Sequence, residues 1–146
     1  MRSWEYVGLV TRGIAFAVDA AVINAVAILV AAGVALILSV LDVPDDFDTW
    51  IAAAGAACFV VWTVLYFVVF WSATGQTPGN RLMRIRVCRA EDGEVLRPRR
   101  SAVRFAGLVL SALLLFTGFL PILFDGRRRG AHDMLAGSVV VGVEPG

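Results

Sequence analysis

The hydrophobic residues of this chain form long runs that are separated by short polar stretches. Three runs, residues 14–41, 50–73 and 105–124, contain a single charged residue between them. An α-helix rises 1.5 Å per residue, so about 20 apolar residues cross the hydrocarbon core of a bilayer. The pattern therefore predicts an all-α integral membrane protein with three hydrophobic helical segments.

The third segment, residues 105–124, admits two structures. It contains Gly118 and Pro121, and both residue types disfavour an uninterrupted helix. A plain third span would place the arginines of the tail, Arg127–Arg129, outside the cell, against the usual bias of basic residues. A kinked or re-entrant segment, bending near Gly118 and Pro121, would return the tail to the cytoplasmic side. The sequence leaves both structures open.

A small β element is predicted next to the membrane. Residues 84–89 alternate charged and apolar side chains, Asp92-Gly93 is typical of a hairpin turn, and the alternation resumes at residues 94–96. Residues 138–143 form a further run rich in valine. An isolated hairpin is marginal in water, so a third strand would stabilise it. We expect a cytoplasmic β-hairpin or small sheet, which the tail joins if it lies on the same side.

The arginines predict the orientation. The loop of residues 74–104 holds eight arginines, whereas residues 42–48 hold four aspartates and no arginine. Arg2 and Arg12 add positive charge near the N-terminus. Because basic loops stay in the cytoplasm, we expect a multi-pass protein of the cell (plasma or inner) membrane with a cytoplasmic N-terminus. The basic loop could also attract anionic lipid headgroups, at about 1 kcal/mol per arginine.

Composition supports the membrane assignment and excludes other classes. Hydrophobic residues make up 59% of the 146 residues, charged residues 17%, and the mean hydropathy is +0.79. Soluble domains have about 45–50% apolar and about 25% charged residues. A formal net charge of +1 gives no basis for a nucleic-acid partner. We expect one membrane domain over residues 1–146, with its cytoplasmic loop at 74–104 and its tail at 125–146.

Asp19 is the single charge inside the first hydrophobic run. A carboxylate in a membrane helix costs about 2.5–3.5 kcal/mol on insertion scales, so it is a candidate functional residue. Arg12 lies seven residues earlier on the same helix face, about 10.5 Å away along the axis, too far for a direct ion pair. The partner of Asp19 must come from another segment, from water or from a neighbouring subunit. The alternative is a protonated Asp19 that is merely hydrogen-bonded within a packed bundle.

A stripe of small residues lies beside the face that carries Asp19. Small side chains allow a second membrane helix to approach closely, and Asn24 within the stripe could form a hydrogen bond across the contact. The stripe consists of Ala17, Ala20, Ala27, Ala31 and Ala35.

Motifs for catalysis, metals and cofactors are weak. Residues 75–81 resemble a phosphate loop but lack its Gly-Lys-Ser/Thr ending, so a sharp turn is the better interpretation. His132 has no accompanying set of histidines or cysteines for a metal site. No nucleophile has a base at a credible spacing. We therefore expect no catalytic residue, no cofactor and no metal, and we do not expect an enzyme.

Three motifs occur in order along nearly the whole chain: Arg12-x-x-Ala-x-x-x-Asp19, Gly75-Gln-Thr-Pro-Gly79, and a third that begins His132-Asp133 and ends at Ser138-Val-Val-Val. Together they resemble the RDD family of small bacterial membrane domains, which is named for one arginine and two aspartates. Two positions depart from the family pattern, Asn80 in place of lysine and Ser138 in place of threonine.

The resemblance implies a set of functional residues. The name-giving residues are Arg12, Asp19 and Asp133. The residues that support the motifs are Gly75, Thr77, Gly79 and His132.

The resemblance leaves two functions open. Some family members are linked to ion or proton antiport, and others hold larger membrane complexes together. We slightly favour an accessory or assembly subunit that docks in a membrane complex or homo-oligomer. The alternative is a small ion or proton-coupled transporter, with Asp19 aligned with Arg12 and Asp133. Three hydrophobic segments are too few for an alternating-access pathway, so transport would require an oligomer.

Overall fold

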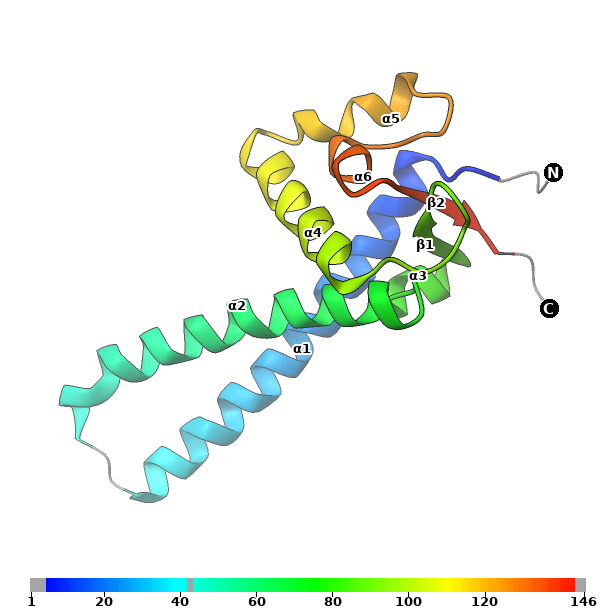
Figure 1. The fold of residues 1–146 in the computed structure, drawn as a ribbon. Coiled ribbons are helices and arrows are strands. Elements are labelled where there is room, and N and C mark those ends of the chain that lie inside the picture. The colour runs from blue at the N-terminus through cyan, green and yellow to red at the C-terminus, as the bar shows by residue number, and fades with distance from the viewer. Residues whose placement is uncertain (1–4, 42–43, 144–146) are drawn as a thin grey trace.

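A computed structural model describes residues 5–41 and 44–143, with the side chain of Asp45 left out. Arg2 and Asp42, which contribute to the predicted orientation, lie outside the described residues, as do residues 144–146 at the end of the predicted domain. The described chain is mostly helical and contains a small antiparallel sheet (Figure 1).

Two helices are long and apolar enough to cross a membrane, and they project together from the rest of the molecule (Figure 1). Helix α1 spans Leu9–Leu41 and helix α2 spans Asp48–Ala73, with the short 3-10 helix η1 (Asp45–Phe47) before α2. Their most apolar windows have mean hydropathies of 2.7 and 2.2. These helices correspond to the first two predicted hydrophobic segments.

The predicted third hydrophobic helix, residues 105–124, does not form. Residues 105–113 instead end helix α4 (Pro98–Leu113), and the chain then breaks into η2 (Thr117–Phe119) and α5 (Pro121–Phe124). Leu115 and Phe116 adopt positive φ angles of 52° and 61°, which end the helix before Gly118 and Pro121 are reached. The bend that the sequence allowed is therefore present, slightly earlier than predicted.

The sheet differs from the predicted hairpin in its pairing. Strand β1 (Ile85–Arg89) pairs antiparallel with β2 (Ser138–Gly142), and Val87 lies opposite Val140. Residues 94–96, the expected second strand, form no strand, although the Glu94 carbonyl accepts a hydrogen bond from the Arg89 amide at 2.8 Å. The tail thus pairs with β1 directly, and Tyr6 adds an isolated bridge to β2. Both described ends of the chain meet at this sheet (Figure 1).

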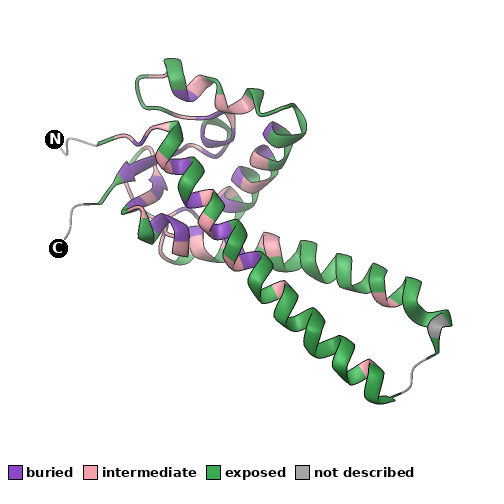
Figure 2. Cartoon of the chain, turned by 180° about the vertical axis from the view of Figure 1, so that it is seen from behind, coloured by how far each residue is buried: buried purple, intermediate pink, exposed green. Residues whose placement is uncertain are grey.

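Buried residues divide the molecule into two regions (Figure 2). We call residues 5–23 and 66–143 the base, and residues 24–41 and 48–65 the outer fork. The base contains the hydrophobic core, in which Phe67 and Trp71 of α2 pack with residues of the sheet. No residue of the outer fork is buried.

Short helices complete the base. Helix α3 (Pro78–Leu82) packs on α1, and α6 (Ala131–Ala136) packs on α4. The Thr77 side chain accepts a hydrogen bond from the Asn80 amide and so caps α3, with Pro78 at the first helical position. Gly137 ends α6 in the left-handed conformation and leads directly into β2.

Candidate functional site

Asp133 is a fully buried carboxylate in the first turn of α6, where several elements meet. Its Oδ2 accepts hydrogen bonds from Arg12 Nη1 at 2.5 Å and from the Gly130 amide at 3.1 Å. Its Oδ1 accepts from Arg104 Nε at 2.9 Å and from Ser138 Oγ at 3.2 Å. The Asp133 side chain therefore connects α6 to α1, to α4 and to the start of β2 through hydrogen bonds.

Both arginines are fixed by further contacts. Arg12, which is 2% exposed, donates from Nε to the Val7 carbonyl at 3.1 Å and from Nη2 to the Arg128 carbonyl at 2.6 Å. The guanidinium of Arg104 lies 4.1 Å from the ring centre of Trp71, a cation–π contact with α2. Each guanidinium is thus held by the Asp133 carboxylate and by a second element.

The charges of this cluster depend on one another. Burial alone would raise the pKa of Asp133, but the guanidiniums of Arg104 and Arg12 outweigh it and hold the pKa below its usual range. With two arginines and one aspartate, this set of three side chains carries a formal charge of +1. Removing the carboxylate would leave two buried positive charges facing each other.

His132 lies beside this cluster and is fully buried. Its ring packs 5.1 Å from that of Phe119, and neither ring nitrogen has a hydrogen-bond partner within the described part of the chain. Burial, followed by the charge of Arg104, outweighs the attraction of Asp133 and lowers the pKa of His132 to about 4. The imidazole is therefore neutral at physiological pH.

Asp19 has a separate set of partners. Its Oδ1 accepts hydrogen bonds from Tyr66 Oη and from the Gly79 amide, both at 2.8 Å, and its Oδ2 accepts from Thr77 Oγ1 at 2.6 Å. These donors come from α2, from Thr77 at the start of α3 and from Gly79 within α3. The partners therefore come from other segments, one of the sources anticipated for this residue. Asp19 is 1% exposed.

The glycines of the middle motif make this geometry possible. A Cβ atom on Gly79 would lie 2.1 Å from the Ala15 carbonyl oxygen, so only glycine lets α3 rest against α1. Gly75 has φ +72°, and a Cβ atom there would lie 2.5 Å from the Val87 carbonyl oxygen. The motif therefore presents Thr77 and the Gly79 amide to Asp19.

The structure brings Arg12 and Asp133 together but places Asp19 apart from them. Asp19 has no hydrogen bond or ion pair with either residue. His132 contributes packing beside the first cluster, and the Gly75–Gly79 motif contributes to the second. The two carboxylates therefore form two polar clusters, each binding elements of the base to α1.

Three residues of these clusters were missed in the sequence. Arg104 is one of the eight arginines of the loop of residues 74–104, and Tyr66 and Trp71 lie within the hydrophobic run of residues 50–73. A signal for Arg104 does exist, because four polar or small residues recur every three or four positions and form the buried face of α4. These residues are Ser101, Arg104, Gly107 and Ser111.

Neither cluster has the composition of a metal centre. Within residues 5–41 and 44–143, no group of three or more histidine, cysteine, aspartate or glutamate side chains is placed to hold a metal ion. Each carboxylate instead has its oxygens engaged by protein donors. Chemically, the arrangement can bind helices together and hold buried charges in place.

Comparisons with known proteins agree with this arrangement of motifs. The family model described as "RDD family" matches residues 6–137, nearly the whole chain. The chain is also similar to "Protein FAM8A1" of Homo sapiens, with 30% identity over 87 residues. That match covers 51% of this chain and 21% of the human protein. No solved structure matches the chain.

Proposed function

The chain belongs to the RDD family, and on that premise we propose that it is an assembly subunit whose projecting helices dock within the membrane on a partner protein or on further copies of the chain. The observation that carries the proposal is the exposure of the outer fork. Only 6% of the most apolar window of α1 and 11% of that of α2 is buried by the chain itself. Lipid can cover such surfaces, and so can other membrane helices.

The polar clusters support this role by fixing the fork on the base. Asp19 joins α1 to α2 through Tyr66 and to α3 through Thr77. Arg12 joins the N-terminal end of α1 to α6 through Asp133. The two clusters contact α1 at Arg12 and Asp19, which lie two helical turns apart. Buried hydrogen bonds therefore fix the direction in which α1 leaves the base.

The stripe of small residues supports a docking face on α1. Ala20, Ala31 and Ala35 are exposed, and no element of the described residues covers them. Asn24 is exposed too, and its amide donates to the Ala20 carbonyl of its own helix at 2.7 Å. Small residues are the ones that allow close contact between membrane helices.

A transport function receives less support from the geometry of Asp19. Three protein donors occupy the carboxylate, which is 1% exposed. An ion or proton site would have to release these donors during each cycle. Transport therefore serves as the competing outcome in the experiment below.

We test assembly by measuring the mass of the purified chain, and of any protein bound to it, in mild detergent and in nanodiscs. Ala31→Leu should abolish the association while leaving the melting temperature unchanged, because it changes only an exposed face. Ala25→Leu, on another exposed face of α1, is the matched control and should associate normally. Association that survives Ala31→Leu would contradict the docking face. A wild-type chain that has the mass of a monomer with no bound protein would contradict the proposal. Ion flux by the wild-type chain that is lost in Asp19→Asn would establish a transporter instead.

The proposal includes the orientation: the base lies on the cytoplasmic side of the cell membrane and the η1 turn outside. The arginines of residues 74–104 support it. In a Cys58→Ser, Cys88→Ser background, Thr49→Cys should react with an impermeant maleimide in intact cells, whereas Arg99→Cys should react only after lysis. Both positions are exposed. The opposite labelling pattern would reverse the orientation.

A further inference from the structure

We propose that the base binds one anionic phospholipid, with an acyl chain in an apolar groove beside α1 and its headgroup at Arg128. The groove has a volume of about 700 Å³ and runs between the first turns of α1, the end of α4 and the segment that follows it. Its walls include Leu9 and Phe16 of α1 and Leu108 of α4, and Leu120 and Leu123 complete the opposite side.

The apolar walls of the groove point to hydrocarbon as its occupant. One wall belongs to α1, which is 33 residues long and continues into the outer fork. The other wall belongs to the segment after α4, where Leu115 and Phe124 are 87% and 86% exposed. Surfaces this apolar are stable next to lipid rather than water. A groove between two such surfaces is therefore open to the acyl chains of the leaflet that contains the base.

Positive charge at one end of the groove favours a lipid with an anionic headgroup. The guanidinium Nη1 of Arg128 lies 2.9 Å from the position that a Cβ atom on Gly8 would occupy, directly before Leu9. The backbone carbonyl of Arg128 accepts a hydrogen bond from Arg12, which also lines the groove. Arg128 and the neighbouring Arg127 are exposed, and neither side chain has an ion-pair partner among residues 5–41 and 44–143. A phosphate there would meet the free guanidinium group of Arg128.

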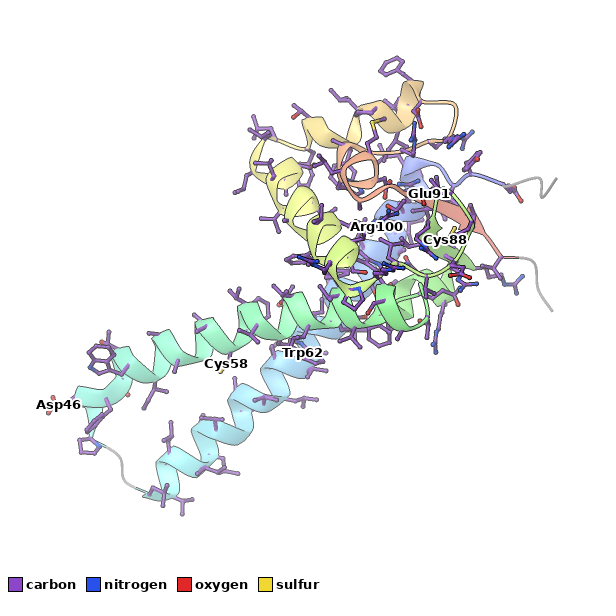
Figure 3. All side chains as sticks on the ribbon, in the orientation of Figure 1. Asp46, Cys58, Trp62, Cys88, Glu91 and Arg100 are labelled. Atoms are coloured by element: carbon purple, nitrogen blue, oxygen red, sulfur yellow. The ribbon has the colours of Figure 1, made fainter. Side chains whose placement is uncertain are left out.

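This site is distinct from the basic loop between α2 and α4. Part of the charge of that loop is already neutralised, since Arg100 pairs with Glu91 at 3.5 Å (Figure 3) and Arg89 pairs with Glu94 at 2.5 Å. The groove instead combines an apolar channel with the unpaired Arg128 near its end, which fits an amphiphile better than a free anion.

Native mass spectrometry of the delipidated protein tests the proposal. Phosphatidylglycerol and phosphatidylcholine with the same acyl chains are titrated in parallel, and inorganic phosphate is titrated alone. We expect one phosphatidylglycerol per chain, weaker binding of phosphatidylcholine, and no binding of phosphate. Binding of phosphate as strong as that of phosphatidylglycerol would replace the lipid site with a plain anion site and overturn the proposal.

Variants separate the two parts of the site. Arg128→Gln should reduce the preference for phosphatidylglycerol about fivefold, the equivalent of about 1 kcal/mol per arginine at a membrane surface. Arg99→Gln, on the exposed start of α4, is the matched control and should leave the preference unchanged. Equal effects of the two substitutions would show nonspecific attraction and overturn the headgroup assignment.

Filling the groove should remove both lipids. Ala112→Phe adds an aromatic ring to the groove. Gly13→Leu adds a branched aliphatic side chain from α1, where no described atom beyond the local helix backbone lies within 4 Å of the added Cβ. Ala106→Phe, exposed on α4 but outside the groove lining, is the control. We expect at least a tenfold loss of binding in both groove variants with an unchanged melting temperature. Unchanged binding in both would overturn the proposal.

Discussion

The base and the outer fork place polar and apolar groups in opposite ways. The base buries Arg12, Arg104, Asp19 and Asp133, each at 2% exposure or less. The outer fork exposes valine, leucine and isoleucine along both helices. Side chains are correspondingly crowded in the base and project freely from the outer fork, as they do around Cys58 (Figure 3).

This difference shows where the specificity of the fold resides. In the base, each buried charge requires particular partners at particular distances, so few substitutions are tolerated. In the outer fork, no described residue is buried, so a changed side chain breaks few tertiary contacts within the described chain. We therefore expect large changes in the free energy of unfolding from the base, and changes in association from the outer fork.

Loss of the Asp133 carboxylate should have the largest effect. Asp133→Asn would leave the buried guanidiniums of Arg12 and Arg104 without their counter-charge, at a cost of about 3–5 kcal/mol. The free energy of unfolding is measured by denaturant titration in mixed micelles. Asp125→Asn, which breaks a more accessible pair with Arg129, should cost about 1 kcal/mol or less. Equal losses in the two variants would show that burial of the first pair has no energetic consequence.

Substitutions at Asp19 should rank next and should depend on hydrogen bonding. Asp19→Leu leaves Tyr66 Oη, Thr77 Oγ1 and the Gly79 amide without an acceptor, and we expect a loss of about 3 kcal/mol in the same titration. Asp19→Asn keeps one acceptor oxygen and should lose about half as much. Tyr66→Phe removes one donor and should cost about 1 kcal/mol. An Asn variant that is less stable than the Leu variant would contradict this ranking.

Lowering the pH should reduce the free energy of unfolding of the base region, over a pH range that is determined by His132. The pKa of His132 is about 4 in the folded protein and about 6.5 in the unfolded chain. The unfolded state therefore takes up the proton first, so stability is complete above pH 6.5 and falls as the pH drops toward 4. The loss reaches about 3 kcal/mol. The melting temperature measured between pH 8 and pH 4 shows this slope.

Substitution of His132 tests whether this residue causes the pH dependence of the melting temperature. His132→Phe keeps a ring against Phe119 and removes two nitrogens that have no partner in the described chain. We expect it to lose the pH dependence between 6.5 and 4. The lowered pKa of Asp133 adds a separate loss that begins below about pH 4, and this second loss should remain. A wild-type slope above pH 4 in His132→Phe would contradict the assignment.

Substitutions of the glycines of the outer fork should change the free energy of unfolding least. No atom lies within 4 Å of a Cβ built on Gly33 or Gly55, so Gly33→Leu and Gly55→Leu should leave the chain equally stable or up to about 1 kcal/mol more stable. Gly79→Ala, which clashes with the Ala15 carbonyl oxygen in the base, provides the contrast and should destabilise strongly. Destabilisation by Gly33→Leu in detergent would show that the outer fork has contacts that the single chain does not reveal.

Sequence patterns were sufficient to predict two long apolar helices, to single out Asp19 and to locate the family motifs. Long hydrophobic runs predict α1 and α2 because hydrophobicity is a property of each segment alone. The same reasoning failed for residues 105–124, where Leu115 and Phe116 turn the chain. That run is as hydrophobic as a span, but whether it spans depends on the contacts of the tail with β1.

The pairing of the buried charges, in contrast, depends on the folded arrangement of distant segments. Asp133 contacts Arg12, 121 positions away, and Arg104, 29 positions away, and no local pattern encodes either distance. The spacing along α4 sets Arg104 apart from the other loop arginines, but only the packing of α4 on α6 gives it Asp133 as a partner. The division of the name-giving residues into two clusters likewise depends on the glycine contact between α3 and α1. Local hydrophobicity selects the helices, whereas long-range packing selects the partners of each buried charge.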